Sequence, residues 1–570
     1  MDSKQNARFK VKIFILTFTE KKVRIFVPNQ AGNESVKMKN ILKNKYYLYM
    51  TEFFSGMSVM AVELGASRLL APYFSSSQIV WTIIIGTIMI AMALGNIWGG
   101  RTADKNPNPD KLYGRLLVAA VWIAAIPLAG KYIILVISGV LVLTVSNHFL
   151  VLAAFIACMV IFVYPLFLLG TVTPSLVKYT VDSLDDSGSI VGTLGAFNTI
   201  GSILGTFLPT FVTIPAVGTA ITFLIFSGVL LVLGLIYFIS KRSGKRICAL
   251  ALVLFILCSV FGHADSFAFW EKDLAYEGES IYNYLQVKET DSRVILSTNV
   301  LFGVQSVKMK EDGLTGMYYD YALAAPFLAG VMQKDSTSDV LILGMGTGTF
   351  ATQCRKYFPG ALSIEGVEID QKITDLAGIY FDLPEEIPVT TYDGRAYLQA
   401  VDKTYDVIMV DAYQDITIPF QMSSTEFFSE VKAHLKPGGV MVVNMNMKSD
   451  GEESINAYLS DTIASVFSEV YTTDVKNNTN RELFASDNPQ MLELMAEGVE
   501  VVADEELSQM MRTVADAMTA YEPGNLILTD DQAPVEVLGM RVIDEIIRDE
   551  IGYYKNIFKE DGIQGILQAL

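Results

Sequence analysis

The chain has 570 residues, of which 51% are hydrophobic and only 18% are charged, whereas about a quarter of the residues in a soluble globular protein are charged. Its charge is divided unevenly, because residues 1–265 carry 22 Lys and Arg against 11 Asp and Glu, whereas residues 266–570 carry 21 against 50. This composition excludes a single soluble domain, and so negative a second half repels nucleic acid but attracts cations, polyamines among them.

The first half of the chain predicts a multi-pass bundle of membrane-spanning helices, residues 47–265, behind a basic N-terminal segment, residues 1–46. Seven apolar segments are each close to the ~20 residues that cross a bilayer as a helix: 47–71, 78–98, 114–136, 149–170, 188–212, 217–240 and 247–262. Gly201 and Gly205 form a small-residue pattern that lets two helices pack closely. We therefore expect about seven spans.

The second half predicts a small antiparallel β domain, residues 266–335, followed by a Rossmann-like α/β domain, residues 336–570. The segments SIYNYLQVKE and RVILSTN alternate and are rich in β-branched and aromatic residues, as strands of a small sheet are. Further along, the segments DVLILGMG, SIEGVEID, PVTTYD, YDVIMVDAY and GGVMVVNMN alternate with helical segments. That order indicates βαβ units and a mostly parallel sheet.

A glycine-rich turn follows the first strand of the α/β domain, with Gly344, Gly346 and Gly348. Glycine lets the backbone approach a ligand closely, and the N-terminus of a helix comes next. A dinucleotide fingerprint would need a glycine at position 349, where the chain has Thr349. The spacing therefore suits a nucleoside cofactor without a pyrophosphate.

Carboxylates stand at the ends of the following strands. Glu368 lies 20 residues after Gly348, where a carboxylate can accept hydrogen bonds from both ribose hydroxyls. Asp393, followed by Gly394, is placed to meet an adenine amino group, and Asp411 ends the strand YDVIMV. Open α/β sheets bind ligands at these strand ends, so the order predicts a nucleoside site of the S-adenosylmethionine type.

With these motifs, residues 279–446 resemble the spermidine synthases, the aminopropyltransferases, and the whole chain resembles the membrane-fused spermidine-synthase-like proteins. The resemblance rests on the glycine-rich loop, on Glu368 and Asp370, on the Asp393 motif, and on Asp411 at the place of the family's catalytic aspartate. It implies the family's fold and its donor class.

The resemblance also implies a role for individual residues. It implies cofactor-binding roles for Asn283, Gly344, Gly346, Thr347, Gly348, Glu368, Asp393 and Gly394, catalytic roles for Asp411 and Tyr319, and substrate-binding roles for Gln305, Tyr413 and Asp415. The departures from the family lie mainly on the substrate side: Asn283 replaces a Gln, Tyr-Tyr-Asp replaces Tyr-His-Glu at 318–320, and the proline beside Asp415 is missing.

The reaction that the resemblance implies transfers an aminopropyl group from S-adenosylmethionine or its decarboxylated form to an amine, with release of methylthioadenosine. Asp411 would then take a proton from the amine. Thr347 stands where the family has an Asp that holds the donor's amino group, which leaves two other enzymes open: a lyase that releases methylthioadenosine without an acceptor, and a methyltransferase. A transporter or sensor with a nucleoside-binding domain is the alternative from another class.

The partners expected are a small molecule, with a polyamine as the candidate, the lipid bilayer, and a second copy of the chain in a homodimer. No metal is expected, because the four cysteines and three histidines are scattered. Lys and Arg mark the cytoplasmic side and cluster before the first span, within 101–115 and within 241–246. With seven spans, this pattern puts the α/β domain outside the cytoplasm, whereas a donor made in the cytosol favours a cytoplasmic domain in the cell membrane.

Overall fold

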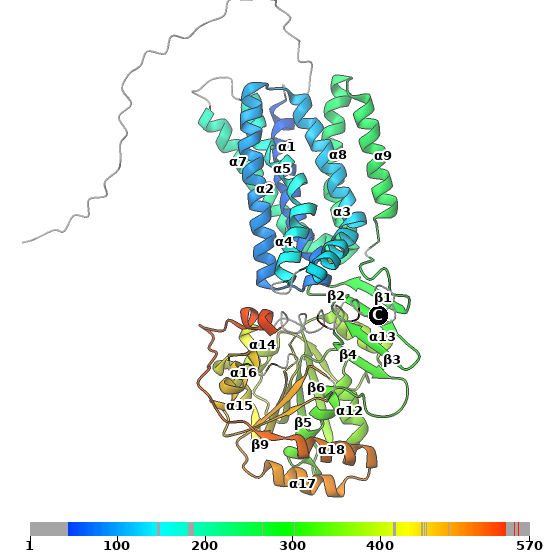
Figure 1. The fold of residues 1–570 in the computed structure, drawn as a ribbon, viewed down its shortest axis with the longest axis vertical. Helices are drawn as coiled ribbons and strands as arrows, with labels where there is room; N and C mark the ends of the chain where they lie inside the picture. Colours follow the sequence, from blue (N-terminus) through cyan, green and yellow to red (C-terminus); the bar gives the residue numbers. More distant parts are fainter. Residues whose placement is uncertain are drawn as a thin grey trace, which may run out of the picture.

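The computed structural model describes residues 44–144, 149–180, 187–264, 266–300, 303–413, 418–445, 453–476 and 478–542, with the single residues 449, 451, 552 and 557. Most of the basic N-terminal segment, Asp415, and most of the last 28 residues lie outside this description. A helical bundle is stacked end-on against a domain built on a sheet (Figure 1). The chain passes once from the bundle to the sheet domain, after helix α9.

Nine α-helices make up the described part of the bundle. They are α1 (Lys45–Phe74), α2 (Gln78–Lys105), α3 (Pro109–Thr144), α4 (Phe149–Ile161), α5 (Val163–Gly170), α6 (Val172–Thr180), α7 (Ser187–Leu208), α8 (Ile214–Lys241) and α9 (Lys245–Phe261). Helices α1 and α7 pack closely because Gly201 and Gly205 have no side chain. A Cβ atom at either position would lie 2.0 or 2.1 Å from a carbonyl oxygen of α1. The expected packing role of this glycine pair is confirmed.

Four helical segments in the described residues are long and apolar enough to cross a membrane: Lys45–Phe74, Gln78–Lys105, Pro109–Leu141 and Ser187–Lys241. A fifth crossing is possible for Phe149–Ile161 with Val163–Thr180, which are bent by 49°. The expectation of about seven separate spans is therefore met only in part. The expected spans 188–212 and 217–240 form one 55-residue helical segment, and α9 has only 17 residues.

The soluble part holds two sheets. The smaller has the order β1-β2-β3-β4 and is antiparallel, and the larger has the order β12-β10-β11-β9-β8-β5-β6-β7. Their strands are β1 (Leu274–Glu279), β2 (Tyr284–Glu289), β3 (Arg293–Ser297), β4 (Ser306–Met309), β5 (Ser338–Leu343), β6 (Leu362–Glu368), β7 (Val389–Thr391), β8 (Tyr405–Val410), β9 (Leu435–Met445), β10 (Glu469–Asp474), β11 (Arg481–Ser486) and β12 (Thr519–Ala520). Strands β5 to β9 run parallel, which confirms the Rossmann-like domain.

Helices cover both faces of the larger sheet, as a parallel sheet requires. They are α10 (Tyr318–Ala322), α11 (Ala324–Leu328), α12 (Thr349–Tyr357), α13 (Gln371–Tyr380), α14 (Gly394–Ala400), α15 (Thr425–Ala433), α16 (Ile455–Ala464), α17 (Met491–Val501) and α18 (Glu505–Ala517). Strand β8 is buried along its whole length. The residues that follow β5, β6 and β8 are thereby fixed at one edge of a rigid sheet.

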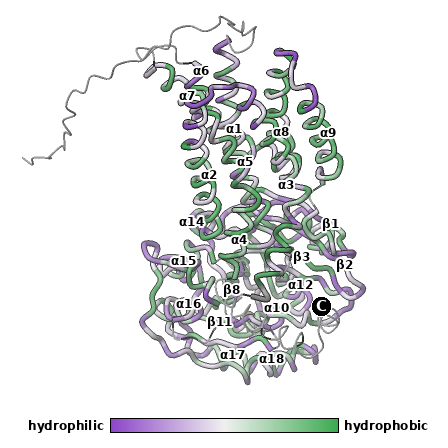
Figure 2. The backbone as a smooth tube through the Cα atoms, turned by 45° about the horizontal axis from the view of Figure 1, so that its top comes forward, coloured by the Kyte–Doolittle hydropathy of each residue, from purple (hydrophilic) through white to green (hydrophobic). Residues whose placement is uncertain are grey.

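This edge of the sheet faces the end of the bundle (Figure 1). Hydrogen bonds join the two parts: Val300 N to Pro72 O (2.9 Å), Tyr73 Oη to Phe267 O (3.0 Å), Thr219 N and Oγ1 to the Glu279 carboxylate (2.8 Å each) and Gln78 N to Glu536 Oε2 (2.7 Å). Most residues along the helices of the bundle are hydrophobic, and hydrophilic residues gather at the end of the bundle away from the sheet (Figure 2).

Candidate active site

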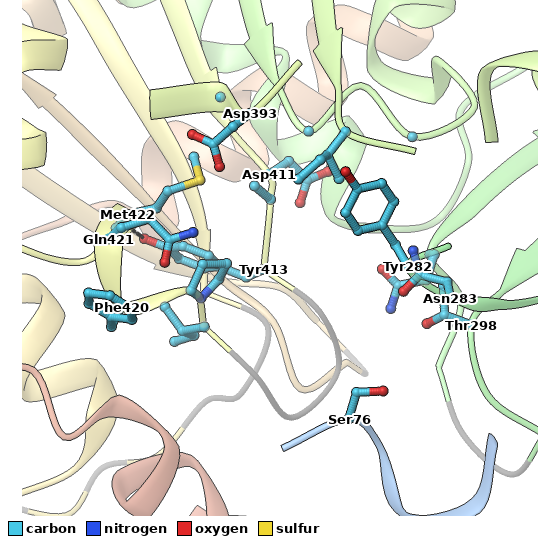
Figure 3. Close-up of a pocket in the computed structure, with 18 of the residues that line it drawn as sticks. Ser76, Tyr282, Asn283, Thr298, Asp393, Asp411, Tyr413, Phe420, Gln421 and Met422 are labelled. Carbon is cyan, nitrogen blue, oxygen red and sulfur yellow. Dashed lines mark hydrogen bonds between the residues drawn. The ribbon is translucent and has the colours of Figure 1, made fainter. Parts of the chain in front are cut away.

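A pocket of about 620 Å³ lies between the carboxyl edge of the sheet and the end of the bundle. Figure 3 shows Asp393 and Asp411 on one side of it and Ser76, at the end of α1, on the opposite side. Ten of the thirteen residues predicted for the site line this pocket: Asn283, Gln305, Tyr319, Gly344, Gly346, Glu368, Asp393, Gly394, Asp411 and Tyr413. The sequence argument from strand ends therefore located the cavity.

The glycine-rich loop forms the floor of the pocket after β5. Gly344 has φ 88°, a backbone conformation that only glycine adopts readily, and a Cβ there would lie 2.5 Å from the carbonyl oxygen of Asp411. Gly346 N donates to Glu368 Oε2 at 2.8 Å. Thr347 and Gly348, both predicted to bind the cofactor, do not line this pocket, because the chain turns away there to begin α12.

Glu368 ends β6 and is buried, with an exposed fraction of 7%. Its carboxylate accepts hydrogen bonds from Gly346 N and from Asp370 N at 3.0 Å. Burial raises the pKa of Glu368 to about 7 despite these donors, since a buried carboxylate is disfavoured in its charged form. The Glu368 carboxylate also lines the pocket, where it could accept further hydrogen bonds, for example from a pair of ribose hydroxyls.

Asp393 stands after β7 and caps helix α14, because its Oδ1 accepts from Ala396 N at 2.9 Å. Its neighbour Gly394 lines the same part of the pocket, with the Met422 side chain close by. Asp393 thus has a local structural role and also lines the cavity (Figure 3).

Asp411 follows β8 and is held by two donors. Asn444 Nδ2 donates to its Oδ1 and Tyr318 Oη donates to its Oδ2, both at 2.8 Å. Burial of the carboxylate raises the pKa of Asp411 to about 7, although both hydrogen bonds lower it. A carboxylate whose pKa lies near neutrality suits a general base.

The tyrosine that donates a hydrogen bond to Asp411 is Tyr318, and Tyr319, for which a catalytic role was predicted, lines the pocket beside it. The two rings lie 4.0 Å apart, but Tyr319 Oη donates to the carbonyl oxygen of Gln305 at 2.7 Å. Tyr319 therefore fixes the wall that carries Gln305. Tyr318 and Tyr319 are adjacent in the sequence, and the orientation in which α10 packs determines which of the two contacts Asp411.

Asn283, predicted to bind the cofactor, and Tyr413, predicted to bind the substrate, also have structural partners. Asn283 Nδ2 donates to Asp370 Oδ2 at 3.1 Å, and Tyr413 Oη donates to the carbonyl oxygen of Met422 at 3.0 Å. Asp415 lies outside the described residues. Both Asn283 and Tyr413 still face the cavity (Figure 3).

Two groups stand out among the site residues that were not predicted from the sequence. Asn444 lies near the end of β9, the parallel neighbour of β8, so the strand-end argument could have found it. The second group belongs to the bundle: Ser76, Gln78, Ile79 and Thr82. Nothing in the sequence indicates that the start of α2 meets the edge of the sheet.

Comparisons with known proteins agree with this geometry. The family model described as "Spermine/spermidine synthase domain" matches residues 328–477. A probable polyamine aminopropyl transferase of Bifidobacterium longum (strain NCC 2705) is 59% identical over 353 residues, which cover 59% of this chain and 78% of that protein. The chain belongs to the spermine/spermidine synthase family.

Members of this family at lower identity include the polyamine aminopropyltransferase of Vibrio vulnificus (strain CMCP6), 25% identical over 51% of this chain and 98% of its own length. A solved structure of a probable spermidine synthase from Corynebacterium glutamicum covers 45% of this chain and 99% of its own length, at 18% identity and a TM-score of 0.34. That structural similarity is too low to add to the assignment. The sequence resemblance to the spermidine synthases is confirmed, and the chain is a transferase of the aminopropyltransferase type.

Proposed function

We propose that this protein is a membrane-bound aminopropyltransferase that moves the aminopropyl group of decarboxylated S-adenosylmethionine to an amine and releases methylthioadenosine. The observation that carries the proposal is Asp411, placed in the pocket between Tyr318 and Asn444 and directly beside the glycine-rich loop. The family membership of the chain supports the same reaction.

The nucleoside part of the donor would lie along the strand ends. Glu368 would accept hydrogen bonds from the ribose, Asp393 would face the adenine, and the missing Cβ atoms at Gly344 and Gly346 leave room for the ligand. The reacting carbon would then lie near Asp411, one strand further along the sheet edge.

The transfer step requires little more than alignment and one proton transfer. The lone pair of the amine attacks the aminopropyl carbon, the C–S bond breaks, and its electron pair stays on sulfur, so neutral methylthioadenosine leaves without a proton. The proton lost by the amine passes to Asp411. Holding donor and acceptor in line supplies most of the acceleration.

A lyase that cleaves the donor without an acceptor is the second candidate, and one observation favours it. The Thr347 side chain, which replaces the family's donor-holding Asp, is buried, has no hydrogen-bond partner among the described residues and does not line the pocket. The donor's amino group would then be held differently from that in the family, which favours intact S-adenosylmethionine as a substrate.

The test is product identification with purified full-length protein, either donor, and putrescine present or absent. We expect methylthioadenosine together with an extended amine. Methylthioadenosine without any amine product would indicate the lyase, and S-adenosylhomocysteine a methyltransferase. Asp411→Asn should lower the rate by roughly 10²–10⁴-fold while methylthioadenosine binds nearly as well as before.

We further infer that the chain crosses the membrane seven times, as a membrane-fused member of its family. Gly218, with φ 80° and ψ 171°, breaks the 55-residue helical segment near the start of α8, and α7 packs mainly against α1 whereas α8 packs mainly against α3. The 17 residues of α9 are about 26 Å long, close to the ~30 Å of the hydrocarbon core.

The soluble domain, we infer, lies outside the cytoplasm. Salt bridges place the basic ends of α6 and α8 beside the connection between α2 and α3: Lys178 to Asp104 at 2.9 Å and Lys241 to Asp110 at 2.5 Å. The connections at the other end, 75–77 and 209–218, contain no Lys or Arg. We therefore give the positive-inside rule more weight than the argument that the donor is made in the cytosol. With this orientation, the donor has to cross the membrane to reach the site.

A further inference from the structure

The bundle contributes a wall of the reaction pocket. Gln78, Ile79 and Thr82 from the first turns of α2 line it together with Ser76, which lies across the cavity from Asp411 (Figure 3). Gln78 N donates to Glu536 Oε2 at 2.7 Å, so the segment of the soluble domain that closes this side is tied to the helix. The acceptor site is therefore built partly from a membrane helix.

The depth of this wall in the bilayer follows from the length of α2. The helix has 28 residues and is about 42 Å long at a rise of ~1.5 Å per residue, whereas the hydrocarbon core is ~30 Å thick. About one turn at each end then lies at the depth of the lipid headgroups. Gln78 falls within that length, and Thr82 lies at its inner boundary.

The pocket mouth continues into the lipid-facing surface of α2. Gln78, Thr82, Ile85 and Met89 lie on one face of the helix by their spacing of three and four residues. All four are exposed, Ile85 by 43% and Met89 by 65%. A molecule that lies in the membrane against this face can reach the pocket without leaving the headgroup layer.

Exposed apolar side chains stand in and beside the pocket lining, together with polar ones such as Gln421, and carboxylates lie inside it. Ile281, Tyr282, Phe420 and Val537 are each about half exposed at the bundle-facing side of the soluble domain, and exposed apolar groups of this kind mark membrane contacts. Inside stand the carboxylates of Glu368, Asp411 and Glu536. The site thus fits a cationic amine attached to an apolar body.

We propose that the acceptor is the primary amine of a membrane lipid headgroup. This inference rests on the proposed transferase function and names its substrate. The neutral headgroup amine attacks the aminopropyl carbon, the C–S bond breaks toward sulfur, and the surplus proton passes to Asp411. The products are methylthioadenosine and a lipid whose headgroup carries an aminopropyl extension. The strong negative charge of residues 266–570 excludes anionic headgroups without an amine.

The test uses the full-length protein reconstituted in vesicles of phosphatidylcholine alone or of phosphatidylcholine with phosphatidylethanolamine. Decarboxylated S-adenosylmethionine is the donor, and methylthioadenosine and the extracted lipids are measured by mass spectrometry. We expect phosphatidylethanolamine lengthened by one aminopropyl group, in amounts equal to the methylthioadenosine released, and no release in phosphatidylcholine alone.

Putrescine added to the phosphatidylcholine vesicles separates the two proposals. An extended polyamine in these vesicles, with no lipid product in the vesicles that contain phosphatidylethanolamine, overturns the lipid acceptor and leaves the transferase standing. No methylthioadenosine in any vesicle overturns both.

A matched pair of variants tests the route along α2. Thr82→Trp fills the mouth and should lower the rate of lipid extension by about tenfold or more, because a displaced acceptor reacts poorly. Val253→Trp, an exposed apolar position on α9 outside the pocket and away from this face of α2, should leave the rate unchanged. Equal rates for the two variants would contradict entry from the membrane.

Discussion

Asp411 shows how the site sets the protonation of a single residue. Its two hydrogen bonds, from Asn444 and Tyr318, favour the carboxylate, whereas burial favours the neutral acid and wins, so that its pKa lies at about 7. A base of this kind is half charged near neutrality and titrates within the range where activity can be measured.

Activity should therefore rise with pH through about pH 7, because only the ionised Asp411 accepts a proton. Tyr318→Phe removes a donor to the carboxylate, which raises the pKa of Asp411 and moves the rising limb of kcat/KM to higher pH. Profiles of the two proteins with the same amine measure this. A limb that moves to lower pH, or an unchanged limb, would count against Asp411 as the base.

Glu482 is a second buried acid close to Asp411, and it has a different role. It lies on β11 opposite Asn444 of β9, it is completely buried, and neither carboxylate oxygen has a hydrogen-bond partner among the described residues. Burial, followed by the charge of Asp411, raises its pKa well above the usual value of 4.5. Burial thus favours the neutral form of Glu482 in the folded protein.

Glu482→Gln should raise the melting temperature at neutral pH. Because the folded-state pKa is raised, the stability of the wild type is complete below pH 4.5 and falls as pH increases, whereas glutamine has no proton to retain. Thermal unfolding of both proteins in the same detergent, at acid and at neutral pH, checks this. A gain in the melting temperature that is larger at acid pH would refute the assignment.

At the scale of elements, the segment 279–283 links the bundle to the site. The Arg68 guanidinium on α1 donates to the carbonyl oxygen of Ile281, and Thr219 on α8 donates twice to Glu279. On the other side, Asp370 accepts from Ser280 Oγ at 2.5 Å. The segment is thereby held between two membrane helices and the end of β6.

Arg68→Met should loosen this segment and raise KM for the donor several-fold with a smaller effect on kcat, because Tyr282 and Asn283 line the pocket but neither transfers the proton. The control is Lys288→Met, which breaks an ion pair with Glu271 on the other side of the small sheet and should leave KM unchanged. If kcat alone fell for Arg68→Met, the segment would have no part in binding.

The elements also show what could be predicted from the sequence. The strand-end carboxylates Glu368 and Asp411 were found because parallel strands bring their carboxyl ends to one edge. The choice between Tyr318 and Tyr319 depends on the orientation of a five-residue helix, which no periodicity reveals. The wall from α2 depends on how the bundle meets the sheet domain, which local sequence patterns do not reveal. Two of the seven apolar segments form one helical segment because the chain stays helical beyond α7 and is broken only at Gly218.

At the scale of the whole molecule, the arrangement of charge predicts the orientation in the membrane. A single cysteine at Asp516, exposed on the soluble domain, in a chain without its four native cysteines should react with a membrane-impermeant reagent in intact cells. Lys245→Cys, exposed at the basic end of α9, should react only after the cells are opened. The reverse pattern would place the catalytic domain in the cytoplasm.

The proposed transfer of an aminopropyl group is tested most directly by a donor labelled in the three carbons of that group. Asp411, the residues proposed to hold the nucleoside and the residues contributed by α2 line one cavity. We therefore predict that each methylthioadenosine released leaves one label bonded to an amine, and that Asp411→Asn lowers the rates at which both products form by the same factor. Label that leaves as a fragment without an amine, or that stays on the nucleoside product, would contradict the transferase.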